Sequence, residues 1–573
     1  MRRVASGLTA LAVVVAIGAC SVGTPETATH TGTPTGPPAG TDTGTRSATR
    51  EGPEYLVFYT EGGQSRAQQA VERAGGTTLA NDAKLGYLTT TGGGATFAEK
   101  AGADGSIVGV SPDRSIGFAE LGRAAPATRR TGGAKARAGT FPDARSFTSS
   151  GSGEPLAGRQ WDMRMIGADR ANAKVPGSRQ VLVGVIDTGV DGKHPDIAPN
   201  FNRELSRNFV TDKPKDETGE TLDGPCEVSS CKDPVDEDDD GHGTHVASTI
   251  AAPINGIGIA GVAPGVQIVN IRAGQDSGFF FLKPSLDALT YAGDIGVDVV
   301  NMSYYVDPWL FNCTANKADS RKEQLEQAAI ITGMQRALDY ARQRGVTLVS
   351  ALGNGSTDLG HPKIDKESPG YPVGEKKTRQ VDNSCLNVPA ESNGVISVAG
   401  LGPSGRKAIY SDYGVEQADV SAPGGDALDG NGAKATRSIL GAAPEQVLRA
   451  AGRIDAKGEP KGADVVKDCA RGTCAYYQYL DGTSMAAPHA TGVAAILISR
   501  FGKPGKAGLE LAPATVEDLL YKTATPKACP TPRQYVYKAY GQDMTQLCEG
   551  DQADNGFFGH GVVDAWKAAT VEP

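Results

Sequence analysis

Runs of apolar residues alternate with helix-like patterns over most of the chain. The run at 181–186 is apolar throughout, which is typical of a parallel strand covered on both faces. Similar runs lie at 266–271, 297–302, 346–351 and 395–399, and patterns with helical periodicity lie at 243–252, 285–293, 325–344 and 485–499. This alternation predicts an α/β fold with a doubly wound, mostly parallel sheet that has helices on both faces.

A shorter pattern of mixed elements comes before this region. Strands are expected near residues 55–59, 77–79, 85–91 and 106–110, and helices near 66–75 and 95–101. The order β-α-β-β-α-β is that of a small ferredoxin-like α+β unit. We therefore expect a small domain at 55–117, then a flexible basic linker at 118–155 that suits proteolysis, and then the larger domain at 156–573.

Residues 1–20 have the pattern of an export signal. Two arginines near the start precede a mostly apolar stretch at 8–19, which is too short to span a bilayer. The stretch ends in Ile-Gly-Ala-Cys20, which resembles a bacterial lipobox and so predicts cleavage before Cys20 and a lipid anchor on it. An ordinary secretory signal that contains a cysteine is the alternative. The Thr-, Gly- and Pro-rich segment at 21–54 is then expected to be a disordered tether.

Charge and cysteine content narrow the functional classes. A net charge of −9 over 573 residues argues against a nucleic-acid partner. Nine cysteines less Cys20 leave eight, an even number that favours disulfides in an exported chain. The expected pairs are Cys226–Cys231, Cys469–Cys474 and Cys529–Cys548, which are near in sequence, and Cys313–Cys385, which remain. Zinc is the rival interpretation of the two pairs with C-x₄-C spacing, but no histidines accompany them.

Ser484 is the first candidate for chemistry. It lies in the stretch Asp-Gly-Thr-Ser-Met-Ala-Ala-Pro-His at 481–489, where glycine allows a tight turn and the residues after the serine begin a helical run. A serine at a helix N-terminus lies at the positive end of the helix dipole, which suits stabilisation of an oxyanion. Alone, the motif is more simply a helix cap. It predicts chemistry only if a base and an orienting acid exist elsewhere.

Asp187 and His242 are candidates for that acid and base. Asp187 ends an apolar run, so its carboxylate is expected in the ligand crevice at the end of a strand, with a simple Asp-Thr-Gly turn as the alternative. His242 is flanked by glycines, and its spacing to His245 would suit a metal pair, but no glutamate lies between them as in the His-Glu-x-x-His zinc motif. A serine hydroxyl needs an imidazole to remove its proton, and the imidazole needs a carboxylate to orient it. Asn354, after another apolar run, is expected to donate to the oxyanion.

Together these stretches resemble the subtilisin-like serine proteases (subtilases). The similarity rests on four motifs in family order: Val-Ile-Asp187-Thr-Gly, Gly-His242-Gly-Thr-His-Val-Ala, Ala-Leu-Gly-Asn354-Gly and Gly-Thr-Ser484-Met-Ala-Ala-Pro-His. The resemblance implies that Asp187 orients His242, which acts as general base and acid. Ser484 is then the nucleophile, and Asn354 completes the oxyanion hole. The resemblance also implies that the small N-terminal domain is a propeptide that inhibits the enzyme, and that maturation cuts within the basic linker.

The resemblance also locates the substrate cleft. Subtilases usually have Leu-Gly-Gly after Asn-Met-Ser, whereas here Ser303 is followed by Tyr304 and Tyr305. That segment normally pairs with the substrate, so the tyrosines would narrow the cleft, add stacking surface or move the strand; packing beneath inserted loops is an equal alternative. The residues expected to bind substrate are Ser277, Gly278, Phe279, Ser303, Tyr304, Tyr305, Ala351 and Gly353. Long insertions at 211–240, 307–322, 355–393 and 425–480 are candidates for lids or specificity loops.

Calcium is the one metal that the sequence suggests. By resemblance, Asp196 and Asn255 align with ligands of a strong calcium site that also uses carbonyls such as those of Ile257 and Ile259. The glutamine ligand expected earlier in the domain is not identifiable. The acidic run at 236–240 is a second calcium candidate, although we expect a solvated acidic loop there. The implied chemistry requires no organic cofactor.

As a whole, the sequence predicts an exported serine endopeptidase that is made as a zymogen. It would bind protein or peptide substrates as an added β-strand, act as a monomer, and contact the membrane only through the lipid on Cys20. Processing within the linker would release the mature enzyme from the membrane. Two alternatives stay open: a catalytically silent relative that binds peptides or cell-wall protein, and a processing protease with one secreted partner. Sedolisins share a Gly-Thr-Ser turn, but their base is a glutamate.

Overall fold

The computed structural model describes residues 52–114, 153–216, 218–372, 374–505, 508–539 and 542–572. Four sequence predictions lie wholly or mostly outside these residues: the signal at 1–20, the lipid anchor on Cys20, the tether at 21–54 and the cleaved linker at 118–155. Within the described residues, no helix has the length and apolar character needed to cross a bilayer.

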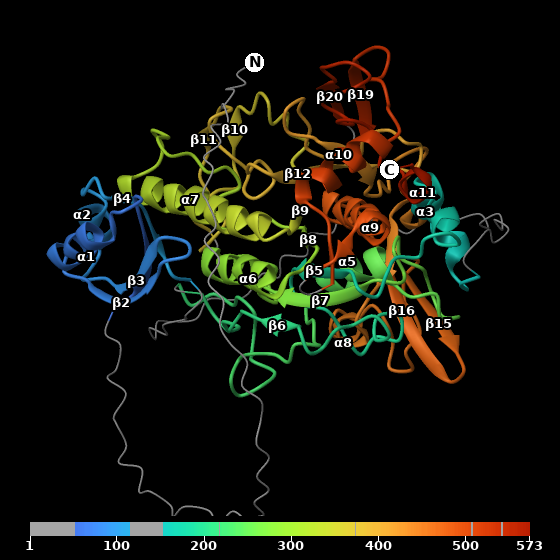
Figure 1. The fold of residues 1–573 in the computed structure, drawn as a ribbon, viewed down its shortest axis with the longest axis horizontal. Helices are drawn as coiled ribbons and strands as arrows, with labels where there is room; N and C mark the ends of the chain where they lie inside the picture. The colour runs from blue at the N-terminus through green and yellow to red at the C-terminus, as the bar shows by residue number, and fades with distance from the viewer. Residues whose placement is uncertain are drawn as a thin grey trace, which may run out of the picture. The chain divides into compact units, whose positions relative to one another are not determined.

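The first described part is a four-stranded antiparallel sheet with two helices (Figure 1). Its elements are β1 (Glu54–Tyr59), α1 (Gln64–Arg73), β2 (Thr77–Asp82), β3 (Tyr87–Thr91), α2 (Phe97–Ala101) and β4 (Ile107–Pro112). The strand order β2-β3-β1-β4 is that of the ferredoxin-like pattern expected from the sequence. Alternate residues of β1 point to opposite faces, so Val57 packs towards α1 and α2 whereas Phe58 faces the rest of the chain.

The second face of this sheet packs on helix α7 (Arg321–Gln343). Phe58 shares an apolar cluster with Met334 of that helix. Arg336 of α7 adds polar contacts, because its guanidinium donates to the backbone carbonyls of Tyr59, Leu85 and Gly86 at 2.8–2.9 Å. The N-terminal sheet is therefore held to the larger part by both apolar and charge-assisted contacts.

The larger part is built on a seven-stranded sheet in which every strand pair is parallel. The strands are β5 (Leu182–Ile186), β6 (Arg207–Asn208), β7 (Gln267–Arg272), β8 (Val299–Met302), β9 (Thr347–Ala351), β12 (Val395–Leu401) and β13 (Val420–Pro423). Their order is β13-β12-β9-β8-β5-β7-β6. This order confirms the doubly wound α/β fold that the alternating pattern predicts.

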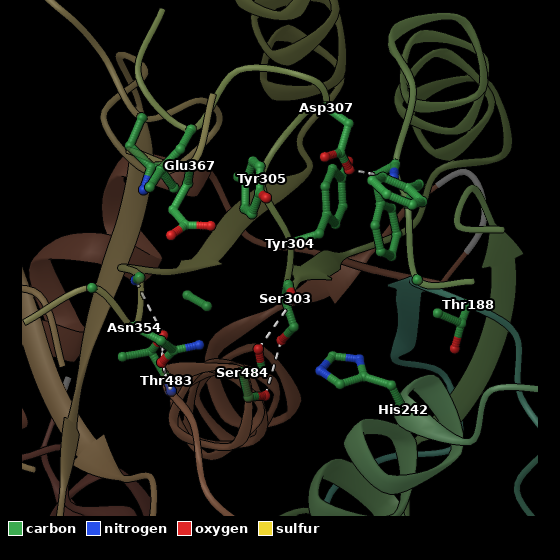
Figure 2. Close-up of a pocket in the computed structure, with 18 of the residues that line it drawn as sticks. Thr188, His242, Ser303, Tyr304, Tyr305, Asp307, Asn354, Glu367, Thr483 and Ser484 are labelled. Atoms are coloured by element: carbon green, nitrogen blue, oxygen red, sulfur yellow. Dashed lines mark hydrogen bonds between the residues drawn. The ribbon is translucent and has the colours of Figure 1, made fainter. Parts of the chain in front are cut away.

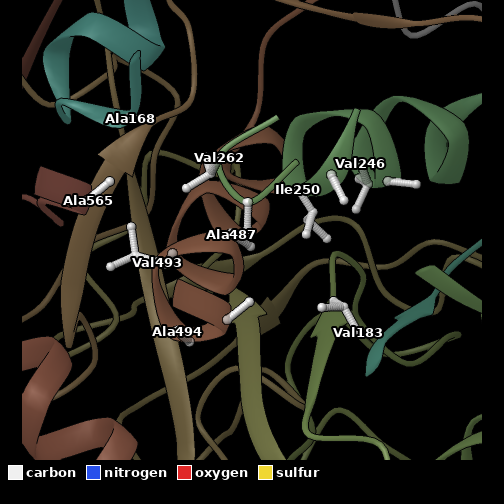
Figure 3. Packing of buried hydrophobic residues seen from close by; sticks show 14 of the residues in the cluster. Ala168, Val183, Val246, Ile250, Val262, Ala487, Val493, Ala494 and Ala565 are labelled. Atoms are coloured by element: carbon white, nitrogen blue, oxygen red, sulfur yellow. The ribbon is translucent and has the colours of Figure 1, made fainter. Parts of the chain in front are cut away.

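Helices cover both faces of this sheet. On one side lie α5 (His242–Ala251) and α9 (Thr483–Phe501), and on the other lie α6 (Leu282–Ile295) and α7. Val183 of β5 belongs to the α5/α9 cluster, whereas the preceding Leu182 belongs to the α6/α7 cluster. Figure 3 shows Val183 beneath Ile250 of α5. Burial on both faces explains why the strands are continuous apolar runs.

Shorter elements and four disulfides complete the chain. The elements are η1 (Ala157–Arg159), α3 (Trp161–Met165), α4 (Ala168–Ala171), β10 (Ile364–Asp365), β11 (Arg379–Gln380), η2 (Ala435–Arg437), β14 (Ile439–Ala442), α8 (Glu445–Ala450), β15 (Val465–Ala470), β16 (Thr473–Leu480), β17 (Lys503–Pro504), β18 (Leu509–Glu510), α10 (Pro513–Thr523), β19 (Gln534–Ala539), β20 (Gln542–Leu547) and α11 (Ala565–Thr570). All four expected disulfides are confirmed: Cys226–Cys231, Cys313–Cys385, Cys469–Cys474 and Cys529–Cys548.

The acidic run at 236–240 is not the solvated loop expected from the sequence. Asp236 is 2% exposed and Asp238 is fully buried. Asp236 pairs with Arg203 and Lys193. Asp238 accepts hydrogen bonds from hydroxyl and backbone donors at the start of α5. Nearby hydrogen-bond donors and cations thus offset the cost of burying these carboxylates, which the composition alone would predict to be exposed to solvent.

Two buried arginines fix the inserted segments to the core. Arg272, at the end of β7, bonds Asp212 and Asp233 of the 211–240 insertion. Arg379 belongs to the 355–393 insertion, and its fully buried side chain bonds several acceptors at 2.5–2.8 Å: Asp319, Asp365 and the carbonyl of Phe311. Because a buried charge is costly unless it is paired, these contacts hold the insertions in one position.

Arg379→Met is expected to destabilise the protein strongly, because it leaves the buried carboxylate of Asp365 without its cation and leaves buried Asp319 paired only with Lys377. The loss in the free energy of unfolding should be about 3–5 kcal/mol. Arg449→Met is the control: it removes an exposed pair with Glu445, which is worth less than about 1 kcal/mol. Urea unfolding in a Ser484→Ala background, which prevents self-digestion, measures both. Equal losses in the two variants would contradict this account of the insertions.

Candidate active site

Asp187 and His242 meet at the carboxyl edge of the sheet. Asp187 follows β5 directly and is fully buried, and His242 is the first residue of α5. The Asp187 Oδ1 atom accepts a hydrogen bond from His242 Nδ1 at 2.7 Å and another from the backbone N–H of Thr188 at 2.8 Å. The first bond keeps a proton on Nδ1, so the neutral ring presents Nε2 as a base.

This approach of α5 to the strand end depends on Gly243 and Asp238. A Cβ on Gly243 would lie 2.0 Å from the carbonyl oxygen of Gly189, so only glycine allows the helix so close. Asp238 accepts from the side chains of Thr188 and Thr244, and this ties the start of α5 to the turn after Asp187. Asp238 is a positioning residue that the sequence did not single out.

Ser484 lies beside His242 in the first turn of α9. The His242 ring faces Ser484, and the Ser484 hydroxyl donates to the backbone carbonyl of Ser303 at 3.2 Å (Figure 2). The Ser303 hydroxyl in turn donates to the carbonyl of Ser484 at 3.0 Å. Rotation of the Ser484 side chain about its Cα–Cβ bond would turn its hydroxyl towards the imidazole, and catalytic hydrogen bonds often form only with substrate. The structure thus gathers the three residues that the sequence predicted.

Asn354 is held with its amide nitrogen towards Ser484 (Figure 2). Its Oδ1 atom accepts from the backbone N–H of Thr483 at 2.9 Å and from the Thr483 hydroxyl at 3.0 Å. Because both of these groups donate, Oδ1 must face them and the NH₂ group must point away. Backbone N–H groups in the first turn of a helix lack intrahelical partners, so the N–H of Ser484 can act with the amide. Together they can stabilise an oxyanion.

A pocket of about 500 Å³ lies beside these groups. All of the residues expected to bind substrate line it: Ser277, Gly278, Phe279, Ser303, Tyr304, Tyr305, Ala351 and Gly353. They come from the ends of β7, β8 and β9 and the segments that follow, so one edge of the sheet supplies these residues. Ligand sites of open α/β sheets lie at this edge.

The aromatic residues divide between the pocket wall and the packing behind it. Tyr304 stacks on Phe280 with ring centroids 4.2 Å apart, and both line the pocket. Phe281 is 1% exposed and packs on Tyr371 at 5.0 Å, so it supports the wall from behind. The sequence left open whether the aromatic residues add stacking surface to the cleft or pack beneath inserted loops. Tyr304 and Phe280 do the first, and Phe281 and Tyr371 do the second.

Several lining residues were not predicted. Asp240 lies two residues before His242 in sequence, and Asp307 and Leu310 follow the two tyrosines. Glu367 and Asn387 come from the inserted 355–393 segment, and the Glu367 side chain pairs with Lys376. Local sequence gives no signal for Glu367 and Asn387, because long-range contacts of the insertion bring them to the cleft.

The family assignment follows from comparison with known sequences. The model of the subtilase family matches residues 178–561. The chain belongs to the subtilase family. It is similar to fervidolysin from Fervidobacterium pennivorans, with 29% identity over 62% of this chain and 40% of that protein. It is also similar to the thermophilic serine proteinase of Bacillus sp. (strain AK1), with 28% identity over 56% of this chain and 53% of that protein.

A solved subtilase gives the same fold. The epidermin leader peptide processing serine protease of Staphylococcus aureus has a TM-score of 0.57 and 21% identity, and the match covers 90% of this chain and 98% of that one. The matches to fervidolysin and to the Bacillus enzyme span only 40% and 53% of those proteins. The comparisons therefore show a subtilase-family domain at residues 178–561 and a subtilisin-like fold.

Charges around the subtilase histidine favour its protonated form. Burial alone would lower the pKa of His242, but the charge and hydrogen bond of Asp187, with the charges of Asp240 and Asp238, raise it to about 9. The Oδ1 atom of Asp240 accepts from the backbone N–H of His242 at 3.0 Å. Burial raises the pKa of Asp240 to about 6, so this carboxylate is ionised where the histidine titrates. The neutral form of His242, which can act as a base, therefore predominates only at a pH above this raised pKa.

The candidate calcium ligands lie together but bind protein donors. Asp196 is fully buried, and its Oδ2 atom accepts from the Tyr477 hydroxyl and from the Ile259 N–H, each at 3.0 Å. Its Oδ1 atom accepts from the Asn255 amide at 3.3 Å. A calcium ion would need these same oxygens, and N–H and O–H donors point at them instead. The donor set at Asp196 and Asn255 therefore does not fit calcium in this arrangement.

Two further histidines are structural. His489 is buried under Ser484 on α9, and its ring bonds the carbonyl of Met485 at 2.8 Å and Asp162 at 3.1 Å. The Nε2 atom of His245 contacts two backbone carbonyls at 3.1 Å, those of Ile439 and Gln478. Neither histidine is presented to the pocket, which agrees with the packing role expected for His489.

Asp240→Asn is expected to move the pH dependence of kcat/KM towards acid by about one pH unit. Neutral His242 is the base, so activity rises as the pH passes through the pKa of His242. In the wild type the negative charge of Asp240 raises that pKa. Removal of the charge therefore lowers the pH at which activity is half-maximal. Asparagine keeps an oxygen that can accept from the His242 N–H. Asp239→Asn is the control, because Asp239 is not among the charges that raise the pKa of His242. A midpoint unmoved by Asp240→Asn, or moved equally by both variants, would contradict this origin of the shift.

Proposed function

We propose that this subtilase cleaves peptide bonds through an acyl-enzyme at Ser484, and that it is exported and made as a zymogen. The observation that carries the proposal is the 2.7 Å bond between His242 Nδ1 and Asp187 Oδ1 in a ring that faces Ser484 across the pocket. This arrangement supports Ser484 as the nucleophile, His242 as the base and Asp187 as the orienting acid.

Acylation begins when a peptide lies along the pocket as an added strand. The Ser484 hydroxyl turns from the Ser303 carbonyl to His242 Nε2, which takes its proton while Oγ attacks the peptide carbonyl carbon. The Asn354 amide and the Ser484 N–H stabilise the resulting oxyanion. Asp187 stabilises the imidazolium that forms. His242 then gives the proton to the leaving amine, and an ester remains on Ser484.

Deacylation repeats the sequence with water. His242 takes a proton from a water molecule, the hydroxide oxygen attacks the ester carbonyl, and the same donors stabilise the second oxyanion. The imidazolium returns the proton to Ser484 Oγ as the new carboxyl group leaves. The chain, the peptide and water supply every group that takes part in this mechanism.

The zymogen part of the proposal assigns residues 55–117 as an inhibitory propeptide. Its support is the docking of that sheet on α7 through Phe58 and Arg336. The export part assigns residues 1–20 as a signal and Cys20 as a lipid anchor, and the release of the mature enzyme follows from a cut within 118–155. The acting form is proposed to be a monomer.

Narrow substrate specificity is a second candidate property. It is favoured by Tyr304, which stacks on Phe280 in the pocket wall and stands where subtilases usually have the smaller leucine. The solved structure from Staphylococcus aureus is that of a leader peptide processing protease, which is consistent with narrow specificity. Cleavage of a peptide library would separate broad from narrow specificity.

A fluorophosphonate probe is expected to label the wild-type protein and not Ser484→Ala, because only an activated serine reacts with it. Ser303→Ala is the matched control: it removes the hydroxyl that bonds the Ser484 carbonyl but should keep the labelling. Mass spectrometry of the labelled peptide identifies the modified residue. Labelling that persists in Ser484→Ala, or an unlabelled wild type with no peptidase activity, would favour the silent peptide binder.

Full-length wild-type protein is expected to cut itself within 118–155, whereas Ser484→Ala stays intact. N-terminal sequencing of the larger fragment locates the cut. In cells, the larger fragment should be soluble, while Cys20→Ser should abolish incorporation of radiolabelled palmitate into the precursor. A mature fragment held firmly in the membrane after loss of the propeptide would contradict the proposed release.

A further inference from the structure

The end of the pocket away from Ser484 is acidic and buried. Asp307 marks this end, opposite Ser484 (Figure 2). It is 5% exposed, and its Oδ2 atom accepts from the backbone N–H of Phe280 at 2.8 Å. Its Oδ1 atom has no hydrogen-bond partner among the described residues. A buried carboxylate oxygen without a hydrogen-bond donor is costly, so Asp307 Oδ1 can still accept a hydrogen bond from a donor that enters this end of the pocket.

Two more side chains complete a site next to Asp307. Glu326 of α7 is 4% exposed, and its Oε2 atom accepts from the Trp309 indole at 3.3 Å. Tyr371, from the 355–393 insertion, is 1% exposed and is packed edge-on against Phe281 at 5.0 Å. Each group is thus fixed by packing or by a hydrogen bond. We call Asp307, Glu326 and Tyr371 the acidic subsite.

An arginine of the N-terminal domain occupies the acidic subsite. Arg114, just after β4, donates from Nη2 to Glu326 Oε1 at 2.6 Å, and its guanidinium carbon lies 5.2 Å from the centre of the Tyr371 ring. Burial raises the pKa of Asp307 to about 7, and the nearby charge of Arg114 acts in the opposite direction. A planar guanidinium suits a site with a carboxylate and an aromatic face, and a lysine ammonium suits it less well.

We propose that the acidic subsite binds an arginine side chain of the substrate after the N-terminal domain has left, and that Arg114 mimics this arginine in the zymogen. The inference rests on the proposed function, because it requires cleavage at Ser484 and removal of the propeptide. Asp307 lies four positions beyond Ser303 along the segment that lines the cleft. A substrate strand that pairs with this segment advances by the same distance per residue, about 3.3 Å. The substrate arginine that reaches Asp307 therefore lies roughly four to six residues before the scissile bond.

The test uses the mature enzyme obtained by self-processing of the full chain. Internally quenched peptides with a constant cleavage site carry one arginine, lysine or glutamine at each of the third to seventh positions before the bond. At one position, arginine should raise kcat/KM over glutamine by about tenfold or more, the range of a hydrogen bond to a charged group. Lysine should give a smaller increase. A flat profile at all positions would overturn the inference.

Glu326→Gln is expected to reduce the arginine-to-glutamine ratio severalfold or more. The matched control is Glu323→Gln on the same helix, which should keep the ratio, because Glu323 pairs with Lys377 and glutamine also serves at this position of the helix cap. Reaction with a fluorophosphonate confirms that each variant is folded at the active site. If Glu326→Gln does not fold, Asp307→Asn is measured by the same ratio. An arginine preference unchanged in the folded variant would overturn the assignment.

These outcomes separate the inference from the function on which it rests. An enzyme that reacts with the probe and cleaves peptides without preferring arginine disproves only the acidic subsite. A protein that neither reacts nor cleaves disproves the proposed function itself. If arginine is preferred equally in wild type and Glu326→Gln, Arg114 is only a docking contact of the N-terminal domain.

Discussion

The buried bond between Asp187 and His242 depends on the parallel sheet, because it joins residues that lie 55 positions apart in the chain. All strands of the sheet end at the same edge, so the turn after β5 and the start of α5 can meet there. Asp187 is fully buried, and its Oδ2 atom has no partner in the described part of the chain. Its charge is therefore best compensated when His242 is a cation, which is the state that acyl transfer creates.

The insertions around this edge are held by charge pairs instead of a large apolar core of their own. Arg272 is surrounded by three carboxylates and Arg379 by two, and both guanidinium groups are fully buried. Buried pairs contribute little net stability but are costly to break, so they fix geometry more than they raise stability. As a consequence, the 355–393 insertion, whose Tyr371 packs behind the pocket wall, is held in one position, which suits a surface that selects substrates.

The sequence predicted the features that depend on neighbouring residues. The apolar runs of β5 and β9, the glycines beside His242 and the turn before Ser484 are all local signals. The sequence did not predict the features that depend on contacts between distant segments. Asp238 is buried because Thr188 and Thr244 satisfy it, and Tyr477, from an insertion, donates to the predicted calcium ligand Asp196. The grouping of Asp307, Glu326 and Tyr371 was equally invisible, because three separate segments supply it.

In the proposed zymogen, two arginines link the parts in opposite directions. Arg336 reaches from α7 into the N-terminal sheet, and Arg114 reaches from that sheet to Glu326. While the chain is intact, such contacts form within one molecule, at an effective concentration set by the length of the linker. A cut in the linker removes this advantage without changing any contact. Arg114 then leaves by dilution, and the buried carboxylates of Glu326 and Asp307 lose their cation. Buried carboxylates without a cation are costly in free energy, which favours the binding of an arginine from another chain. A substrate can supply that arginine.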